Sequence, residues 1–257
     1  MKTAIVIPSR YASTRLPGKP LLAETGQPLI RHVYEQAVCA KKADKVVVAT
    51  DDARIFDIVA EFGGDAVMTD SAHETGSARV AEAAEKIDAD IIVNLQGDEP
   101  EIDPAHIDRL IDMQVRFKPF ASTLVCPFPS EAKKGAGSPD DSSAVKAVLG
   151  AQFEPDVFEA RYFTRNICPW PRDEFGEIAT PSDYFLHVGV YAFSKYSLAA
   201  FAKAPSGVLE RAERLEQLRI LEMGERIIAG VIDRAAPGID TPEDYRLFVA
   251  RVGKGAA

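Results

Sequence analysis

Short apolar runs alternate with helical stripes along the first half of the chain. The runs contain few polar residues, which predicts buried strands at residues 4–7, 45–50, 66–68 and 91–95. Apolar residues at helical spacing predict helices at residues 28–40, 55–62, 78–87 and 107–115. Because strands and helices alternate, we expect a parallel sheet built from right-handed strand–helix–strand units.

The pattern changes after residue 120, where strands follow one another without regular helices between them. These strands are expected at residues 121–126, 144–149, 157–164, 186–193 and 227–232. A charged helix is expected over 209–223, and a final helix begins at Thr241-Pro242, a good cap followed by a good first residue. We therefore expect one mixed α/β domain, residues 1–257, with βα units in 1–120 and an inserted β-rich part within 121–257.

Composition and charge narrow the class of protein. The chain has 257 residues, of which 46% are hydrophobic and 27% charged, as in an ordinary globular protein. Its net charge of −9 argues against nucleic acid as a partner, because a phosphate backbone requires a cationic face. The three cysteines are widely spaced and odd in number, which favours a reducing compartment over a disulfide framework. No apolar run is long enough to span a membrane. We expect a cytoplasmic protein without a signal peptide or membrane insertion.

The segment between the first strand and the first helix, residues 8–20, is rich in groups that bind phosphate. It contains three cations and two hydroxyls: Arg10, Arg15, Lys19, Ser13 and Thr14. Open α/β sheets bind ligands beyond the carboxyl ends of their strands, and such cations suit phosphate oxygens. The 8–20 loop is neither a Walker A motif nor a dinucleotide fingerprint. It predicts a polyphosphate site, with a solvated basic turn as the alternative.

Two aspartates also follow predicted strands. Asp98 lies in a Gln-Gly-Asp turn after the strand at 91–95, and Asp240 lies between the last strand and the last helix. A carboxylate at this edge of the sheet is suited to a Mg²⁺ ion that also binds phosphate. The alternatives are an ordinary turn residue at Asp98 and a helix-flanking cap at Asp240.

Other candidate residues have plain structural explanations as well. The helix start at 75–79 offers amides and hydroxyls to a base or ribose, or is an ordinary capped helix. His187 and Tyr191 share one face of a strand, where a core histidine is as good an explanation as a ligand contact. Arg165 suits a substrate carboxylate, and the cluster at 213–217 is by itself a solvated helix face.

Several motifs together resemble one family, the 3-deoxy-manno-octulosonate (Kdo) cytidylyltransferases, over essentially the whole chain. The most specific are the opening signature Pro8-Ser9-Arg10-Tyr11-Ala12-Ser13-Thr14-Arg15-Leu16-Pro17-Gly18-Lys19-Pro20-Leu21 and the turn Gln96-Gly97-Asp98-Glu99-Pro100. The others, in the same order as in the family, are Val48-Ala49-Thr50-Asp51, His187-Val188-Gly189-Val190-Tyr191, Leu215-Glu216-Gln217-Leu218-Arg219 and Gly238-Ile239-Asp240-Thr241-Pro242-Glu243-Asp244.

The resemblance implies a nucleotide-diphospho-sugar transferase fold, a Rossmann-like three-layer sandwich with a mostly parallel mixed sheet. It implies an enzyme that joins CTP and Kdo into CMP-Kdo and pyrophosphate with Mg²⁺, for lipopolysaccharide synthesis. It also implies a cytoplasmic homodimer, with sugar binding and dimerisation in residues 121–257. The closest alternatives are a relative that uses 8-amino-Kdo or a sialic acid, and a catalytically silent nucleotide-binding module.

Roles transfer from the family to matching positions of this sequence. Arg10, Arg15 and Lys19 would hold the triphosphate, and Asp98 and Asp240 would bind Mg²⁺. Cytidine would be contacted by Thr75, Gly76, Ser77 and Arg79. The sugar-acid pocket would be formed by Gln96, Arg165, His187, Tyr191, Glu213 and Gln217. Glu210 and Glu216 compete with Glu213 for its role, and Ala78 departs from the acidic residue common at its position.

Overall fold

The structure is a computed structural model that describes residues 1–12, 15–172 and 175–255. Contacts divide the chain into two compact units. Unit 1 contains residues 1–111 and 236–257, and unit 2 contains residues 112–235. The sequence placed a division near residue 120 and assigned the C-terminal segment to the second part. The structure instead groups that segment with unit 1, and the expectation of a single domain stays a prediction.

Unit 1 is built on four parallel strands, as the alternating pattern predicted. They are β1 (Thr3–Ser9), β2 (Lys45–Thr50), β3 (Ala66–Met68) and β4 (Ile91–Asn94). β1 pairs with both β2 and β4, and β3 pairs with β2. The central strands are almost entirely buried, which explains their continuous apolar runs.

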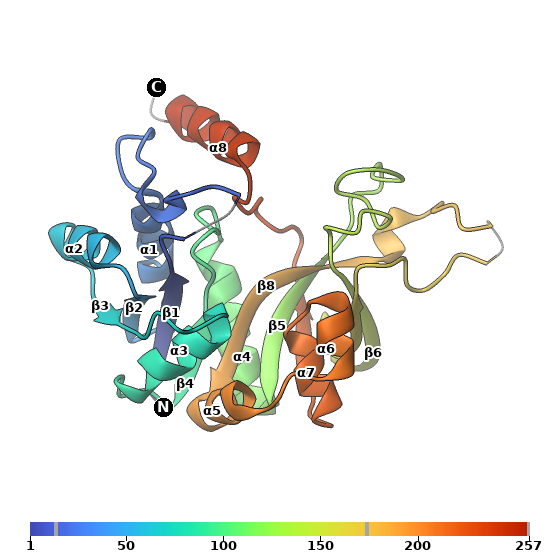
Figure 1. Ribbon diagram of the computed structural model, residues 1–257. Coiled ribbons are helices and arrows are strands. Elements are labelled where there is room, and N and C mark those ends of the chain that lie inside the picture. Colours follow the sequence, from blue (N-terminus) through green and yellow to red (C-terminus); the bar gives the residue numbers. More distant parts are fainter. Residues whose placement is uncertain (13–14, 173–174, 256–257) are drawn as a thin grey trace. The chain divides into compact units, whose positions relative to one another are not determined.

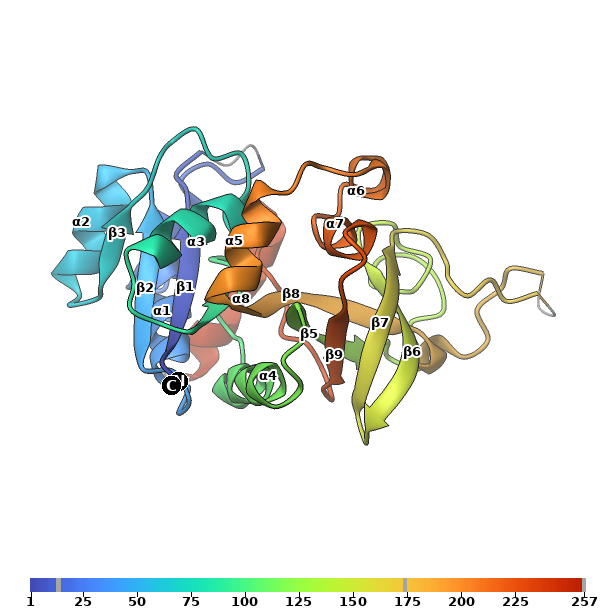
Figure 2. The ribbon, with the colours of Figure 1, turned by 90° about the horizontal axis from the view of Figure 1, so that it is seen from below.

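Helices connect these strands. They are α1 (Leu29–Val38), α2 (Ala53–Glu61) and α3 (Gly76–Glu85), with a short 3₁₀ turn, η1 (Lys19–Leu21), before α1. The chain moves outward from β1 to β3 and then returns to β4. Right-handed crossovers therefore place α3 on the face opposite α1 and α2 (Figure 2). Pro28 is the N-cap of α1, and its backbone is extended.

The C-terminal helix α8 (Pro242–Gly255) packs beside the 8–20 loop in unit 1 (Figure 1). Tyr245 and Phe248 of α8 form one apolar cluster with Leu16, Leu29 and Ile239. Thr241 caps the helix as predicted, since its Oγ1 accepts from the Asp244 amide at 3.2 Å. Leu16 lies between Arg15 and Lys19 in sequence, so this cluster anchors the cationic loop to α8.

Unit 2 contains the β-rich part. Its strands are β5 (Ala121–Pro127), β6 (Lys146–Glu154), β7 (Val157–Thr164), β8 (Phe185–Ser194) and β9 (Ile227–Val231). They pair in the order β8-β5-β9-β7-β6, and the start of β6 also pairs with β8. The pairings therefore run in a ring, and Figure 2 shows β6 beside β7 within it.

Three helices accompany these strands: α5 (Lys195–Lys203), α6 (Val208–Glu213) and α7 (Gln217–Glu222). The prediction missed α5 and drew α6 and α7 as one helix. Arg214 breaks that helix, because it adopts the left-handed conformation at φ 53°. The remaining elements are α4 (Pro104–Phe117), which crosses the unit boundary, and η2 (Pro181–Asp183).

The packing of α8 leads to a test of stability. Phe248 is 1% exposed, so replacing it with alanine leaves a cavity beneath the 8–20 loop. We expect Phe248→Ala to lower the free energy of unfolding by about 3–5 kcal/mol, measured by urea denaturation. Leu247→Ala is the control, because Leu247 lies on the same helix and is 52% exposed. Equal losses in the two variants would contradict the packing described here.

Candidate active site

The carboxyl ends of β1 and β4 come together with unusually close backbone contact. The two strands are parallel neighbours, and the turn that follows β4 passes over the end of β1. A Cβ atom on Gly97 would lie 3.0 Å from the carbonyl oxygen of Pro8, which is shorter than an ordinary van der Waals contact. Glycine at 97 therefore lets Asp98 approach the start of the 8–20 loop.

Lys19 joins three segments of unit 1 at this edge. Its Nζ donates to Asp98 Oδ2 at 2.9 Å and to the carbonyl oxygen of Ile239 at 2.8 Å. Asp240 Oδ1 lies 3.9 Å from the same Nζ, and Arg15 pairs with Asp240 at 2.9 Å. The structure thus brings together two of the predicted phosphate cations and both predicted metal ligands. The Asp98 and Ile239 backbones are also bonded, at 2.9 Å.

A third carboxylate, Glu99, belongs to this cluster and was missed by the sequence analysis. Burial, together with the charges of Asp98 and Asp240, raises its pKa to about 8, while Lys19 opposes the rise. Glu99 therefore carries a proton at neutral pH, which limits the negative charge at the cluster. The sequence could have indicated Glu99, because the run Gln-Gly-Asp-Glu places two adjacent acidic residues after a buried strand.

The residues present fit a Mg²⁺ ion. Asp98 and Asp240 both approach the Lys19 ammonium, so their oxygens converge on one position suited to a cation. Within the described ranges, no group of three or more His, Cys, Asp or Glu side chains could hold a metal ion. A Mg²⁺ ion bound by the two aspartates would complete its coordination with water and phosphate oxygens, as Mg²⁺ commonly does.

The start of α3 lies at the same edge of the sheet. A Cβ on Gly76 would be 3.4 Å from Pro8 Cγ and 3.5 Å from Gln96 Oε1. Thr75 caps the helix by accepting from the Ala78 amide at 3.2 Å. Asn94, a polar residue inside a buried strand, accepts from Gln96 Nε2 at 2.9 Å and donates to Ser77 Oγ at 3.4 Å. The predicted residues Thr75, Gly76, Ser77 and Gln96 are therefore held together.

Arg79 has a different environment from the one its predicted role implies. Its side chain is 3% exposed and donates to Asp51 Oδ2 at 2.9 Å and to Thr69 Oγ1. This buried pair fastens α3 to the ends of β2 and β3. Contact between Arg79 and a base stays a prediction.

The 8–20 loop contains the remaining predicted cation. Arg10 follows β1 directly and is exposed. The hydroxyls of the predicted phosphate loop, Ser13 and Thr14, lie outside the described residues. Gly18 directly precedes η1 and adopts the left-handed conformation at φ 66°, with the Tyr11 ring 3.2 Å from the position a Cβ would take. This turn directs Lys19 toward Asp98.

In unit 2, His187 and Tyr191 are brought together on β8. Their ring centroids are 5.4 Å apart, and Phe163 packs edge-on against His187 at 5.0 Å. The hydroxyl of Thr123 donates to the carbonyl oxygen of Val190 at 2.9 Å and lies 3.1 Å from His187 Nε2. Because the hydroxyl has one hydrogen, Nε2 carries the histidine proton and Nδ1 is an acceptor. Burial lowers the pKa of His187 to about 3, so the ring is neutral.

The hydroxyl of Tyr191 is also buried, and it has no hydrogen-bond partner among the described residues. Burial, with a smaller contribution from Glu216, raises its pKa well above the ordinary value, so it remains a neutral hydroxyl. An unpaired buried hydroxyl costs free energy unless a ligand pairs with it. This feature agrees with the predicted contact to a polar substrate.

Arg165 and Glu213 form a second predicted group in unit 2. Glu213 accepts from Thr164 Oγ1 at 2.7 Å and from the Arg165 amide at 3.0 Å. The Arg165 guanidinium donates to the carbonyl oxygens of Glu213, at 2.8 Å, and Ser142, at 3.1 Å. The Arg165 guanidinium is thus held by backbone oxygens. These bonds do not neutralise its positive charge, because neither acceptor is a carboxylate.

The structure separates Glu213 from one of its competitors. Glu210 forms a buried ion pair with Arg219, which fixes α6 against α7. Gln217, at the start of α7, is 7% exposed. The charged helix face expected from the sequence is therefore partly internal, and Glu213 is the glutamate bonded to Arg165.

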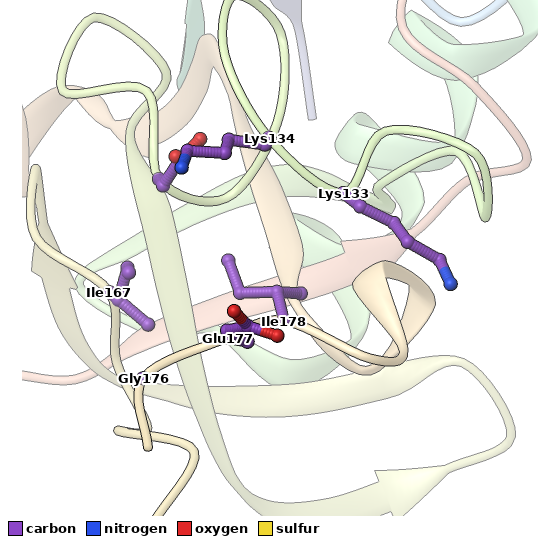
Figure 3. Close-up of a pocket in the computed structure, with 7 residues that line it drawn as sticks. Lys133, Lys134, Ile167, Gly176, Glu177 and Ile178 are labelled. Carbon is purple, nitrogen blue, oxygen red and sulfur yellow. The ribbon is translucent and has the colours of Figure 1, made fainter. Parts of the chain in front are cut away.

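A cavity of about 300 Å³ lies elsewhere in unit 2, between the 133–140 loop and the 167–178 segment (Figure 3). Its lining residues are Lys133, Lys134, Asp140, Ile167, Gly176, Glu177 and Ile178. None of the predicted substrate or metal residues lines it. Its lysines and acids offset one another, so it lacks the charge that an anionic substrate requires.

The neutral, half-buried His187 makes the free energy of unfolding depend on pH. An unfolded histidine titrates near 6.5, whereas folded His187 titrates at about 3, so the unfolded chain binds the extra proton between these values. We expect His187 to contribute a loss in the free energy of unfolding of about 2 kcal/mol from pH 7 to pH 5. Urea denaturation of His187→Gln should show a correspondingly shallower pH dependence.

Val208→Gln on α6 serves as the control: Val208 is exposed and has no titratable group, so the pH dependence should match that of the unaltered chain. The slopes of the free energy of unfolding against pH are compared, because a loss of packing caused by the glutamine lowers stability equally at every pH and leaves the slope unchanged. If His187→Gln retains the full slope of stability against pH, then His187 is not the neutral group described.

Comparisons with known proteins agree with this arrangement. Residues 4–227 match the family model for cytidylyltransferases. The chain is 41% identical to a 3-deoxy-manno-octulosonate cytidylyltransferase from Rhodopirellula baltica, with 98% of this chain and 99% of the relative covered. It is 42% identical to an 8-amino-3,8-dideoxy-manno-octulosonate cytidylyltransferase from Shewanella frigidimarina, with 96% of each covered.

A solved structure gives the same result for the fold. The structure of a CMP:2-keto-3-deoxy-manno-octonic acid synthetase complexed with CTP matches at a TM-score of 0.87 and 38% identity, covering 99% of this chain and all of that chain. An apo UDP-glucose pyrophosphorylase, at 15% identity and a TM-score of 0.67, shares the fold alone. The predicted mixed α/β nucleotidyltransferase fold is confirmed. The chain belongs to the cytidylyltransferase family, among the 3-deoxy-manno-octulosonate cytidylyltransferases and their 8-amino-3,8-dideoxy relatives.

Proposed function

We propose that the protein transfers CMP from CTP to the anomeric hydroxyl of Kdo, giving CMP-Kdo and pyrophosphate for lipopolysaccharide synthesis. The observation that carries the proposal is the convergence of Lys19, Asp98 and Asp240 beyond β1 and β4. It occurs in a chain that aligns almost end to end with 3-deoxy-manno-octulosonate cytidylyltransferases.

Residues of unit 1 bind the nucleotide in this proposal. Arg10, Arg15 and Lys19 hold the triphosphate, because guanidinium and ammonium groups neutralise phosphate oxygens. Lys19 is already fixed by Asp98 and the Ile239 carbonyl, so it is oriented before the substrate arrives. Thr75, Gly76, Ser77 and Arg79 contact cytidine, where the first amides of α3 favour polar and negative groups.

Residues of unit 2 recognise the sugar acid in this proposal. Arg165 binds the carboxylate of Kdo, because its guanidinium is fixed by backbone oxygens and retains its charge. His187 and Tyr191 bind sugar hydroxyls, with Nδ1 of His187 as an acceptor and the buried Tyr191 hydroxyl as an unpaired polar group. Glu213 and Gln217 complete the pocket.

The reaction forms one bond and breaks another at the α-phosphorus of CTP. The anomeric oxygen of Kdo attacks this phosphorus, and the bond to the β-phosphate oxygen breaks to release pyrophosphate. Such a transfer depends on positioning and charge neutralisation, and no covalent nucleophile is needed. Lys19 and Arg10 stabilise the charge on the departing pyrophosphate. A Mg²⁺ ion held by Asp98 and Asp240 would supply further charge neutralisation at the phosphates.

The 8-amino analogue of Kdo is the alternative substrate. This chain is about as similar to an 8-amino-3,8-dideoxy-manno-octulosonate cytidylyltransferase, at 42% identity, as to a 3-deoxy-manno-octulosonate cytidylyltransferase, at 41%. The 8-amino sugar differs by carrying an ammonium group in place of a hydroxyl. A neutral His187 accepts a hydrogen bond from either group, so this residue alone does not separate the two sugars.

The proposal also includes a cytoplasmic homodimer. Three free cysteines, at positions 39, 126 and 168, support a reducing compartment. Within the described residues, no helix has both the length and the apolar character needed to cross a membrane. Light scattering of the purified protein tests the dimer, and a monomer mass at micromolar concentration would reject it.

The reaction is tested by pyrophosphate release from purified protein with CTP, Mg²⁺ and a sugar acid. We expect release that requires Kdo, CTP and metal together, and that is lost with EDTA or with UTP or ATP in place of CTP. Release with the 8-amino sugar or a sialic acid, but not with Kdo, would replace the substrate and keep the reaction. CTP binding without release for any sugar acid would favour a binding module.

The metal assignment is tested with Asp98→Asn. We expect turnover to fall at least about a hundredfold, because the variant loses both a metal ligand and the charge that fixes Lys19. Asp57→Asn on the exposed side of α2 is the control and should keep full activity. Circular dichroism checks that both variants are folded. Turnover close to that of the unaltered enzyme in Asp98→Asn would reject the assignment.

The role of Arg165 is tested by the balance between the two substrates. Arg165→Ala should raise KM for Kdo at least about tenfold and change KM for CTP by less than about twofold, since it removes the proposed carboxylate contact and leaves the proposed nucleotide residues of unit 1 in place. The control is Arg161→Ala, which removes an exposed arginine of β7, the strand that Arg165 follows. Equal increases in both KM values for Arg165→Ala would reject this role.

A further inference from the structure

Lys146 is a buried charge that the proposed function leaves without a role. It is the first residue of β6, its exposed fraction is zero, and all three bonds of its ammonium go to backbone carbonyl oxygens. The acceptors are Asp141 at 2.8 Å, Ala144 at 2.7 Å and Arg165 at 2.6 Å. A buried ammonium is costly unless its donors are satisfied, so this geometry is tightly constrained.

Lys146 also lies where the strand ring of unit 2 closes. It pairs with Thr164 of β7 and with Leu186 of β8. The carbonyl oxygens that it binds come from both sides of this junction. Asp141 and Ala144 belong to the loop before β6, and Arg165 follows β7 directly. One side chain therefore fastens this loop to the residue that leaves β7.

The bonds of Arg165 given above run to Lys146, to α6 and to the loop before β6. Its amide is bound by Glu213, its carbonyl by Lys146, and its guanidinium by the carbonyls of Glu213 and Ser142. Ser142 belongs to the loop that Lys146 holds through the residues on either side, Asp141 and Ala144. Removing the Lys146 ammonium therefore leaves the Arg165 carbonyl without this partner and loosens the loop that carries Ser142, one support of the guanidinium.

We propose that Lys146 is a positioning residue that orients the Arg165 guanidinium for the carboxylate of the sugar acid. The inference rests on the proposed function, because it assigns Arg165 to that carboxylate. Lys146 does not contact the substrate in this proposal. It acts through the 141–144 loop and the Arg165 backbone, so its loss affects sugar-acid binding and leaves CTP binding unchanged.

The first test compares KM values in Lys146→Met, which keeps the length of the apolar stem and removes the donors. We expect KM for the sugar acid to rise about tenfold, with KM for CTP changed by less than about twofold. Gln114→Met is the matched control. Gln114 is also buried in unit 2 and also binds a loop carbonyl, that of Pro119 at 3.1 Å, but it has no bond to Arg165.

A double variant distinguishes positioning from general loss of structure. If Lys146 acts through Arg165, adding Lys146→Met to Arg165→Ala should raise KM for the sugar acid by less than about twofold further. A full tenfold further rise in the double variant, or equal rises in KM for both substrates in the single variant, would overturn the proposal. If Lys146→Met does not fold, Lys146→Gln takes its place, and the same two outcomes apply.

Hydrogen exchange of the enzyme without substrate gives a readout that needs no turnover. We expect faster exchange at residues 141–146 and at the Arg165 amide in Lys146→Met, but not in Gln114→Met. Unchanged exchange at these residues would overturn the positioning role. Failure of the proposed function is recognised separately, because the unaltered protein would then release no pyrophosphate with any sugar acid.

Discussion

The ion pair between Lys19 and Asp98 is the interaction on which the proposed nucleotide site depends. Asp98, Glu99 and Asp240 bring three carboxyl groups to one edge of the unit 1 sheet, where their charges would repel one another. The Lys19 ammonium offsets this repulsion by bonding to Asp98 and lying near Asp240. Protonation of Glu99, favoured by burial, removes part of the remaining charge. The same contacts hold the end of the 8–20 loop beside the turn after β4 and the segment before α8.

Backbone shape makes this charge arrangement accessible. Gly97 permits the turn after β4 to pass over Pro8, and Gly18 permits the turn that points Lys19 back toward the sheet. The apolar cluster beneath the loop places Leu16 against Tyr245 and Phe248 of α8. Segments distant in sequence are therefore held together first by packing and close backbone contact. The contacts of Lys19 with Asp98 and Asp240 then fix the orientation of the charged side chains.

The sequence predicted the strands and the edge of unit 1 well because buried strands have a simple pattern. The apolar runs at β1, β2 and β4 and the polar residues after them placed Lys19, Asp98 and the start of α3 at one edge. It failed where local pattern does not determine conformation. The left-handed Arg214 divides a periodic helical segment, and Lys146 looks like a surface lysine until the ring of strands buries it. The effect of Asp240 on the pKa of Glu99 depends on two segments that are distant in sequence, and a single sequence does not reveal such proximity.

Units 1 and 2 position their charged groups by different means. In unit 1, the lysine is held by carboxylates that are themselves proposed to bind Mg²⁺, so binding of a metal changes the environment of Lys19. In unit 2, Lys146 and Arg165 are held mainly by backbone carbonyl oxygens, whose partial charges do not change when substrate binds. A metal ion bound by Asp98 and Asp240 would change the charge that Lys19 faces, while the Ile239 carbonyl would still hold the ammonium. An arginine held by carbonyls keeps both its charge and its orientation, which suits a group that must recognise a carboxylate. The two kinds of partner thus differ in how far their charge would change when metal and substrate bind.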